Sequence, residues 1–315
     1  MKAYFIIDGN NLAHRAHNSH FDLKKANGDP SGMVYGFMRI LISLKKKYRA
    51  FKFIVVWDNR PDKKYELKPD YKAGRSRLPT KVFDQVGEIK LILSRCGVDQ
   101  YEKRGEEADD VIATLVRRFK DEGSKVYVYS NDKDLLQLVE DGKVTVYRPK
   151  VGNTPEKFFD EEAVKEKFNV SPKKLALYRS FDGDSSDNIS GVPRVRRKLI
   201  ASIVSKQSSL ADIFNSIHDD ADIKKMLSEK EYEAINKHLE TAAINLKIIE
   251  LNQFLEDIDK TEAQYSVEEV SKILSDYEIK SIDAENVIDL FKTSVNIKFT
   301  EPKQAIKLET YSLFD

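Results

Sequence analysis

Residues 3–11 read AYFIIDGNN, an apolar run that ends in an aspartate and a glycine. The apolar part, Ala3–Ile7, predicts a buried β-strand, and the residues after it have helical spacing. Two further runs, Phe53–Trp57 and Lys125–Tyr129, are rich in β-branched and aromatic residues and also predict strands. Because helical patterns separate these runs, the sequence predicts an α/β fold with a mainly parallel central sheet flanked by helices.

The pattern between and after these strands predicts further elements. Met33–Leu44 and Ala108–Phe119 have the spacing of helices, and the apolar residues of 82–93 share the face of one helix. Val144–Tyr147 predicts a fourth strand. From about Asp160 onward the pattern is helical throughout. We therefore expect an α/β unit followed by a helical one.

The length and composition are those of a globular protein with 315 residues, of which 41% are hydrophobic and 33% are charged. No apolar run approaches the roughly 18 residues that span a bilayer, and the N-terminus lacks the features of a signal peptide. We therefore expect a cytoplasmic protein with no membrane partner. The single cysteine, Cys96, excludes an internal disulfide and a cysteine-based zinc site. We expect a core over residues 1–170, a helical unit over 171–295 and a tail over 296–315.

Acidic residues follow the predicted strands at the points where the strands end. Asp8 follows the first strand, Asp58 the second, and Asp132 and Asp134 the third. In an open α/β sheet, ligands bind outside the carboxyl ends of the strands, so we expect these acids at one edge. Close carboxylates repel one another unless a cation neutralises them, and their oxygen atoms suit Mg²⁺, with Mn²⁺ as a substitute. The sequence therefore predicts a metal site at this edge.

Two more acidic pairs have i, i+3 spacing. Glu107 and Asp110 begin a predicted helix and share a face, while Asp109 points elsewhere. Asp184 and Asp187 repeat the spacing in a loop rich in glycine and serine. Each acid alone has a structural alternative, because aspartate is a common turn former and helix cap, and acids at a helix start interact favourably with the helix dipole. Their joint arrangement favours the metal site.

Basic residues point to nucleic acid. The segment 61–81 combines many cations with Tyr65 and Tyr71. Cations neutralise phosphates and tyrosine rings stack on unpaired bases, although a solvated charged helix is an alternative. Gly191–Lys198 places a glycine before four basic residues, which suits the phosphates of a duplex. Zinc is a further alternative, but the acids dominate over the three histidines at helical spacing: His14, His17 and His20.

Six motifs occur together along the chain: IDGNN (7–11), VWD (56–58), DYKAGR (70–75), EADDVI (107–112), SNDKDL (130–135) and GDSSDNISGVP (183–193). In this order and spacing they resemble the 5′→3′ exonuclease/flap endonuclease family, which includes the nuclease domain of bacterial DNA polymerase I and free-standing phage enzymes called RNase H. The resemblance covers residues 1 to about 205. It implies a PIN-like or resolvase-like core, a helical arch at about 60–90 and a duplex-binding helix–three-turn–helix over Lys174–Ile203.

The resemblance also implies two bound metal ions and a role for each matching residue. The first ion would be held or oriented by Asp8, Asp58, Glu107, Asp110 and Asp132, and the second by Asp134, Asp184 and Asp187. Asp109 is a further candidate ligand at a position that varies among relatives. Lys72 and Arg75 match the catalytic cations at the scissile phosphate. Contacts to nucleic acid are expected from Arg15, Arg60, Lys68, Tyr71, Lys72, Arg75, Arg77, Gly191, Arg194, Arg196, Arg197 and Lys198.

One stretch departs from the family pattern. After Gly191–Pro193 the family usually has Gly-apolar-Gly, whereas this chain has Arg194, Val195 and Arg196. Glycines there allow close backbone approach to phosphate and often a monovalent cation, and arginine side chains can contact phosphate instead. We expect duplex binding with altered detail. The variant Arg194→Ala/Arg196→Ala should bind more weakly and with a smaller salt dependence.

The chain ends LETYSLFD (308–315). Its Leu313 and Phe314 resemble the anchor of short peptides that bind sliding clamps, although Thr310 replaces the usual glutamine. Packing of this terminus on its own domain is the alternative.

Together these features predict a stand-alone, monomeric 5′ nuclease that removes primers and processes flaps in DNA replication or repair. Its substrate would be duplex DNA or RNA–DNA with a 5′ end or flap. A PIN-like ribonuclease is one alternative, but such small nucleases have no counterpart of the helical segment with GDSSDNISGVP. A catalytically silent nucleic-acid-binding protein is another, but it would lack one of the first-site acids. The balance between exonuclease and endonuclease action, and between RNA and DNA, stays open.

Overall fold

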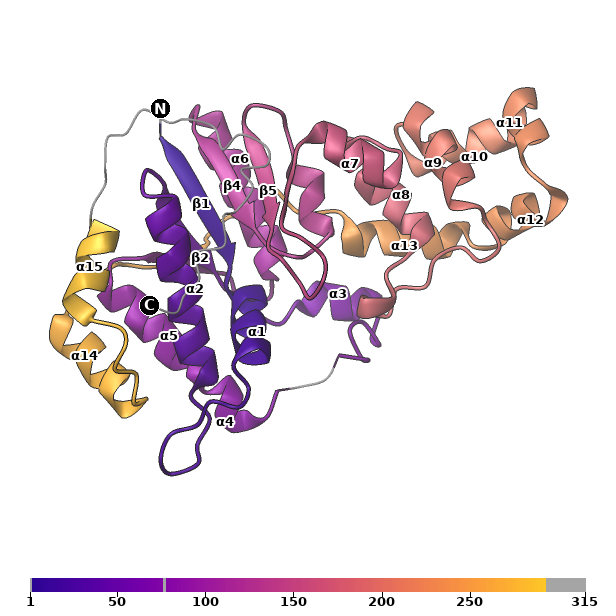
Figure 1. Ribbon diagram of the computed structural model, residues 1–315. Coiled ribbons are helices and arrows are strands. Elements are labelled where there is room, and N and C mark those ends of the chain that lie inside the picture. Colours follow the sequence, from indigo (N-terminus) through magenta and orange to yellow (C-terminus); the bar gives the residue numbers. More distant parts are fainter. Residues whose placement is uncertain (1, 76–77, 293–315) are drawn as a thin grey trace.

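The computed structural model of the protein describes residues 2–75 and 78–292. A seven-stranded sheet with the order β6-β5-β4-β1-β2-β3-β7 forms the centre of this part of the chain (Figure 1). The central strands β5, β4, β1, β2 and β3 run parallel, and the edge strands β6 and β7 run antiparallel to their neighbours. The strands are β1 (Ala3–Asp8), β2 (Lys52–Val56), β3 (Asp99–Glu102), β4 (Lys125–Tyr129), β5 (Val144–Arg148), β6 (Lys157–Phe159) and β7 (Asp259–Thr261).

The register of the parallel strands places their acidic ends together. Asp8, the last residue of β1, pairs with Val56 of β2, and Ile7 pairs with Tyr129 of β4. Asp58 and Asp132 follow the last residues of β2 and β4 within three positions. All three acids therefore lie at the same edge of the sheet, which is called the carboxyl edge below.

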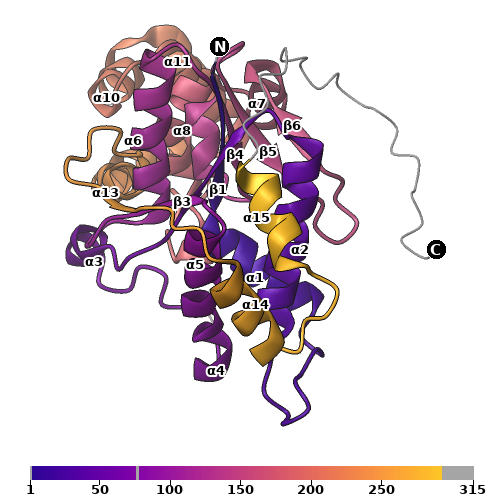
Figure 2. The ribbon, with the colours of Figure 1, turned by 90° about the vertical axis from the view of Figure 1, so that its left-hand side faces the viewer.

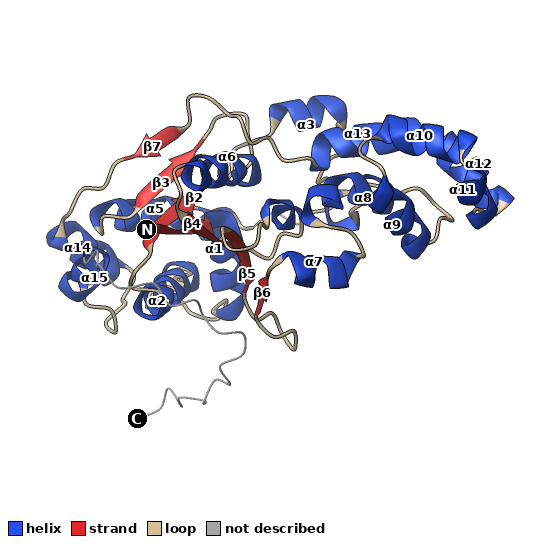
Figure 3. Cartoon of the chain, turned by 90° about the horizontal axis from the view of Figure 1, so that it is seen from above, coloured by secondary structure: helices blue, strands red, loops and turns tan. Residues whose placement is uncertain are grey.

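Helices cover both faces of the sheet and continue beyond it. They are α1 (Gly9–Ser19), α2 (Gly32–Lys47), α3 (Asp62–Leu67), α4 (Thr80–Phe83), α5 (Gln85–Arg95), α6 (Ala108–Asp121), α7 (Glu161–Phe168), α8 (Leu175–Asp182), α9 (Arg197–Lys206), α10 (Leu210–Asp219), α11 (Ala221–Met226), α12 (Glu229–Lys237), α13 (Leu239–Ile249), α14 (Val267–Asp276) and α15 (Ala284–Lys292). Seen from above, α6 lies on one face of the sheet and α2, α14 and α15 lie on the other (Figure 3).

Each face of the sheet has its own hydrophobic core, as the alternation of side chains along the strands requires. Ile6 of β1 points into the core beneath α6, which continues into α8 and α9. Phe5 and Ile7 point into the core that is closed by α1, α2 and α5. The two cores fix the sheet between them, so the carboxyl edge is held by buried side chains on both sides.

The helices α8 to α13 extend away from the sheet as one arm, as the helical pattern after residue 160 predicted (Figure 1). Within it, α8 and α9 are joined by turns that include the 3-10 helix Ser185–Asp187. This arrangement matches the expected helix–three-turn–helix. The helices α11 and α12 lie furthest from the sheet, and α13 returns from them to pack against α8 (Figure 1).

The last described segment differs from the expected division at residue 295. Residues 259–292 leave the arm and return to the α/β core, where β7 pairs with β3, α14 packs on α5 and α15 packs on α2 (Figure 2). Val270, Ile273 and Leu274 of α14 close the core over α5. The strand β7 reads DKT and is exposed, so it has no apolar pattern that a sequence reading would detect.

Two smaller expectations about the elements also differ from the structure. The helix expected over 82–93 is divided at Asp84 into α4 and α5. The strand β3 reads DQYE and was not expected, because it pairs at the side of the sheet without an apolar run. In the described ranges, no helix combines the length and the apolarity that crossing a bilayer requires.

Candidate active site

Four carboxylates gather at the carboxyl edge, and we call Asp8, Asp58, Asp109 and Asp132 the first acid group. They come from the ends of β1, β2 and β4 and from the first turn of α6. Asp8 repels Asp58 and Asp132, and Asp109 repels all three of the others. The strand-end acids predicted from the sequence are therefore within electrostatic reach of one another.

Local hydrogen bonds fix the orientation of this group. One oxygen of Asp8 accepts from Asn11 N (2.9 Å), which caps α1, and the other accepts from Ser130 Oγ (2.8 Å). Asp58 Oδ1 accepts from Ala108 N (2.8 Å) and so ties the end of β2 to the start of α6. A Cβ atom on Gly9 would lie 2.6 Å from the ring of Trp57, so only glycine fits beside Asp8.

Burial and mutual repulsion make ionisation of this group unfavourable. Burial, followed by the charge of Asp58, raises the pKa of Asp8 to about 7. Burial, followed by the charge of Asp132, raises the pKa of Asp109 well above its ordinary value. Burial also raises the pKa of Asp58 and of Asp132. Such a set of oxygens fits a hard divalent cation, which would relieve the repulsion.

The side chains do not enclose an ion as they stand. Within residues 2–75 and 78–292, no three carboxylate, imidazole or thiol groups converge closely enough to coordinate one metal. Carboxylates that repel one another separate when nothing lies between them, so this spacing is the one expected of the protein alone.

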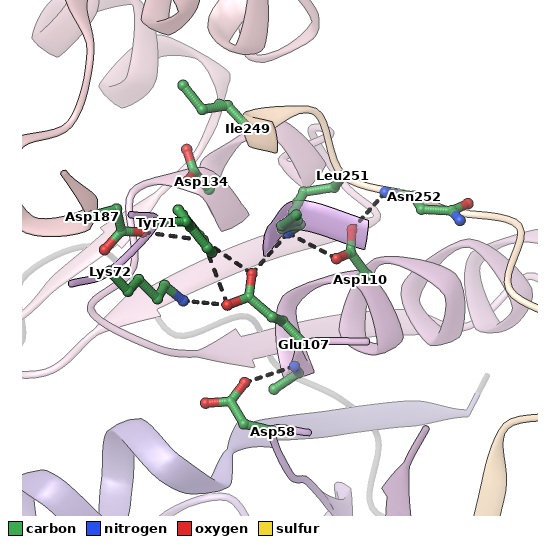
Figure 4. Close-up of polar contacts among 12 residues, drawn as sticks. Asp58, Tyr71, Lys72, Glu107, Asp110, Asp134, Asp187, Ile249, Leu251 and Asn252 are labelled. Carbon is green, nitrogen blue, oxygen red and sulfur yellow. Dashed lines mark hydrogen bonds and ion pairs between the residues drawn. The ribbon is translucent and has the colours of Figure 1, made fainter. Parts of the chain in front are cut away.

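Glu107 and Asp110 differ from the first acid group because cations of the chain neutralise them (Figure 4). Lys64 Nζ lies 2.8 Å from Glu107 Oε2 and 2.9 Å from Asp110 Oδ2, and Lys72 also pairs with Glu107. Although burial opposes it, the charges of Lys64 and Lys72 lower the pKa of Glu107 to about 2. Glu107 therefore stays ionised without a metal.

The structure places Asp109 and Asp110 differently from the sequence expectation. Asp110 was assigned to the first metal by its match to the family motif, and its spacing placed it on the same helical face as Glu107. It does share that face, but both side chains meet Lys64, and Asp110 Oδ1 accepts from Asn252 N (2.8 Å) after α13. Asp109, which the sequence offered only as a further candidate ligand, interacts electrostatically with Asp8, Asp58 and Asp132. Asp109 belongs to the first acid group, and Asp110 joins α6 to the arm.

The expected second-site acids, Asp134, Asp184 and Asp187, form a second acid group that already has cationic partners. Arg179 of α8 is 2% exposed and its guanidinium pairs with both Asp134 and Asp184. Arg75 Nε donates to Asp187 Oδ1 (3.0 Å). These carboxylates have suitable oxygen atoms for a metal, but an ion would have to displace the guanidinium groups first.

The expected catalytic cations lie on a turn that is bound to the loop of the second acid group. Lys72 N donates to Asp187 O (3.0 Å), and Asn188 Nδ2 donates to Asp70 O (2.9 Å). Lys72 has a φ of 56°, in the left-handed region, and its side chain points to Glu107 (Figure 4). The turn therefore holds Lys72 and Arg75 at the boundary between the two acid groups.

Tyr71 does not fit the role of stacking on an unpaired base. Its side chain is 4% exposed, and it packs against Ile248 and Ile249 of α13. Its hydroxyl donates to Glu107 Oε2 (3.1 Å). Tyr71 is therefore part of the joint between the turn, α6 and the arm.

The turn before α9 retains a left-handed residue despite its departure from the family pattern. Arg194 has a φ of 63° and an exposed side chain. Arg196 Nε lies 2.7 Å from Glu231 Oε1, and Arg197 pairs with Asp182. Gly191 is required by packing, because a Cβ atom there would lie 2.4 Å from Asp182 O. Arg194 and Lys198 are thus exposed, whereas Arg196 and Arg197 have carboxylate partners.

Three other residues expected to contact nucleic acid lie in the described ranges, and each has a partner within the protein. Arg15 donates to Lys150 O and lies beside the carboxyl edge on α1. Arg60 lies over the ring of Tyr65, and Lys68 Nζ pairs with Asp70 (2.7 Å). Three expected residues lie outside the described ranges: Arg77, Leu313 and Phe314.

Zinc ligation by the three histidines finds no support in the structure. His20 contacts Ala16 O through Nδ1 at 3.2 Å, which is a contact within its own turn. Burial lowers the pKa of His14; the charge of Asp58 opposes this shift, and the charge of Arg75 adds to it. His14 therefore interacts with the acids and with His17, but the described residues contain no group of three ligands that could hold a metal.

Two functional residues were not found from the sequence. Lys64 was counted only as one of the cations of 61–81, and nothing in that pattern distinguishes the lysine that reaches α6. Arg179 lies among the apolar residues of α8, where its neighbours Tyr178 and Phe181 are buried. A cation on an apolar helix face is a signal of a buried partner, and here the partners are Asp134 and Asp184.

The fold and the acidic edge define a nuclease of the resolvase-like α/β class. The family model for the N-terminal resolvase-like domain of 5′-3′ exonucleases matches residues 3–169. A 5′-3′ exonuclease of Aquifex aeolicus is 33% identical over 285 residues, which are 87% of this chain and 96% of that protein. The chain belongs to the 5′-3′ exonuclease family, as its motifs predicted.

Other relatives agree with this assignment. DNA polymerase I of Bacillus subtilis is 33% identical over 231 residues, which are 73% of this chain but only 26% of the polymerase. The fold is similar to that of the T5 5′-exonuclease with bound zinc, with a TM-score of 0.65 and 20% identity over 92% of this chain and 100% of that one. A bacteriophage T5 flap endonuclease in complex with DNA and metal ions has a TM-score of 0.62, at 20% identity over 93% of this chain and 100% of that one.

Proposed function

We propose that this chain hydrolyses phosphodiester bonds at the 5′ ends and flaps of nucleic acid duplexes with Mg²⁺, for which Mn²⁺ can substitute. The observation that carries this proposal is the first acid group. Four carboxylates, from three strand ends and one helix start, repel one another, and no ion pair in the described ranges joins any of them to a cation of the chain. A divalent cation is the ligand that this arrangement lacks.

The first acid group would hold the ion through Asp8, Asp58, Asp109 and Asp132. A divalent ion bound there lowers the pKa of a coordinated water and stabilises charge on a phosphate. Ser130 and Asn11 hold the Asp8 carboxylate in place, and Ala108 N holds that of Asp58. The ligands are therefore oriented before the ion arrives.

Lys72 and Arg75 would bind the scissile phosphate. Each now pairs with a carboxylate, Lys72 with Glu107 and Arg75 with Asp187. A phosphate oxygen offers the same charge and hydrogen-bond geometry as a carboxylate, so both cations can exchange partners when the substrate arrives. Their place at the boundary between the two acid groups puts the phosphate beside the first one.

A second divalent ion would bind among Asp134, Asp184 and Asp187, as the resemblance implies. Arg179 and Arg75 compensate these carboxylates in the protein alone. An ion must compete with them, so we propose that the second ion binds more weakly than the first. Substrate that draws Arg75 onto its phosphate would free Asp187 and favour the second ion.

The duplex would lie along the arm, at α8, α9 and the turn between them. Exposed Arg194 and Lys198 lie at the start of α9, where backbone amides and cations suit phosphates. The relatives named above are 5′-3′ exonucleases and a flap endonuclease bound to DNA, which supports a substrate with a 5′ end or flap. Action as a monomer, a cytoplasmic location and clamp binding through Leu313 and Phe314 stay predictions.

The test is cleavage of labelled flap, nicked and RNA-primed duplexes with Mg²⁺, by the wild type and by Asp132→Ala. We expect cleavage by the wild type that releases 5′-phosphorylated products, and loss of cleavage in Asp132→Ala. A matched control is Asp276→Ala, which removes an exposed aspartate of α14 far from the carboxyl edge. Cleavage retained by Asp132→Ala, or absent from the wild type on every substrate, would contradict the proposal.

A further inference from the structure

A second group of charges lies at the carboxyl edge, beyond the acids. It consists of Lys133, Arg148, Lys157 and Lys167, and we call it the edge cluster. Arg148 is the last residue of β5 and pairs in register with Lys157, the first residue of β6. Lys133 follows β4 between two of the acids, and Lys167 lies in the last turn of α7.

Three of these cations converge on one aromatic ring. Arg148 Cζ lies 5.2 Å from the ring centroid of Phe159, Lys157 Nζ lies 5.2 Å from it and Lys167 Nζ 5.3 Å from it. Phe159 is 1% exposed, so the ring is a fixed part of the core. A ring face attracts a cation, but it cannot cancel three positive charges.

Few ion pairs compensate the edge cluster in the described part of the chain, although Lys133 interacts electrostatically with Asp184. Among the ion pairs of residues 2–75 and 78–292, the cluster has one, between Lys157 Nζ and Glu166 at 3.9 Å. Arg148 Nε is buried and has no hydrogen-bond partner. Burial, followed by the charges of Arg148, Lys133 and Lys157, lowers the pKa of Lys167 to about 8. The cluster therefore resembles the first acid group, but with positive in place of negative charges, and a bound anion would relieve the repulsion between them.

The position of the cluster beside the acids indicates which anion it would bind. In the strand order β6-β5-β4-β1, Asp132 and Lys133 follow β4, and the other members of the edge cluster begin with Arg148 on β5, one strand further on. Neighbouring strands are about 4.8 Å apart, so Lys157 on β6 is separated from β4 by about 10 Å across the sheet. This distance is within the reach of one or two nucleotides of a strand bound at the acids.

We propose that the edge cluster binds backbone phosphates of the nucleic acid strand that is engaged at the first acid group. The inference rests on the proposed nuclease function and adds a contact surface to it on the β6 side of the sheet. Lys133 begins this surface directly beside the acids, and Arg148, Lys157 and Lys167 continue it. Binding of phosphate here is independent of sequence, because only the charged backbone is contacted.

The test compares two triple variants with the same change in charge. Arg148→Gln/Lys157→Gln/Lys167→Gln neutralises the edge cluster but leaves Lys133, which lies between two acids. The control Lys165→Gln/Lys272→Gln/Lys280→Gln neutralises exposed lysines of α7, α14 and the segment after it. Binding of a labelled 5′-flap duplex is measured in EDTA over a range of salt, so that no cleavage occurs.

We expect the edge-cluster variant to bind about tenfold or more weakly, and the slope of log affinity against log salt to fall by about 2 to 3. Its thermal midpoint should be equal to or above that of the wild type, because repelling charges are removed. A purely structural role would instead lower the midpoint. Equal losses in both triple variants, or unchanged affinity in the edge-cluster variant, would overturn the inference.

The same proteins separate this inference from the proposed function. Cleavage by the wild type together with unchanged binding by the edge-cluster variant would reject the edge cluster alone. Absence of cleavage by the wild type in Mg²⁺ would reject the nuclease function, whatever the binding result.

Discussion

The two acid groups of the site both consist of aspartates, but they differ in whether cationic side chains pair with them. The first acid group has four carboxylates with raised pKa values, and no cationic side chain of the described residues forms an ion pair with them. The second has three carboxylates paired with Arg179 and Arg75. The first therefore depends on an external cation, whereas two guanidinium groups compensate most of the charge of the second in the protein alone. Clustering of acids is not sufficient to indicate a metal, because the partners of the acids decide whether one is needed.

The largest expected effect distinguishes two adjacent residues, of which only one belongs to the first acid group. Asp109→Asn removes a member of the first acid group, and we expect cleavage to fall by at least about 10³-fold, or about 4 kcal/mol of transition-state stabilisation. Asp110→Asn changes a residue that joins α6 to Lys64 and Asn252 N, and cleavage should fall by less than about tenfold. The measurement is kcat/KM on a flap duplex in Mg²⁺. The reverse order of the two variants would show that the assignment of Asp109 and Asp110 is wrong.

A second variant tests whether Arg179 compensates the second acid group. Arg179→Met leaves Asp134 and Asp184 without their buried partner, so the free energy of unfolding should fall by about 3 kcal/mol in EDTA. The freed carboxylates should then bind Mg²⁺ more tightly, and added Mg²⁺ should stabilise the variant more than the wild type. Urea unfolding with and without Mg²⁺ measures both effects. Equal stabilisation of the two proteins by Mg²⁺ would show that Arg179 does not block an ion.

The smallest expected effect concerns pH and the edge cluster. The pKa of Lys167 is lowered to about 8 in the folded protein from an ordinary 10.5, so the unfolded chain binds more protons between these values. The contribution of Lys167 to stability should therefore rise with pH from about 8 to 10.5. Bound phosphate favours the protonated lysine, so affinity for a flap duplex should fall over the same window.

Lys167→Arg provides the control for the pH effect, because it keeps its charge throughout the window. Binding in EDTA is measured from pH 7.5 to 10 for both proteins, and the wild type should lose several-fold more affinity than the variant. Parallel pH profiles would show that Lys167 does not contact phosphate.

The parts predicted from the sequence are those that local pattern determines. The strands β1, β2 and β4 have continuous apolar runs, and an acid at or just after the end of such a run is placed at the edge by the strand itself. The order of the motifs then identified the family, and the resemblance implied the roles of Lys72 and Arg75. These features depend on short stretches of sequence, so they can be recognised without the fold.

The missed parts depend on contacts between distant segments. Asp109 and Asp110 are adjacent, and only the position of Lys64 and of the chain after α13 decides which one faces the metal site. Arg179 is distinguished from a surface cation only by the burial of α8. The exposed strand β7 has no apolar pattern of its own, and its pairing with β3 depends on the packing of α14 and α15.

The central claim is that the first acid group holds a divalent cation, and Mn²⁺ binding followed by electron paramagnetic resonance, with Mg²⁺ as competitor, tests it most directly. The account predicts a tighter site and a weaker one in the wild type. In the variant Asp8→Asn/Asp132→Asn the affinity of the tighter site should fall by at least about tenfold, since two of its four carboxylates are lost. Unchanged affinity for Mn²⁺ in that folded variant would contradict the account.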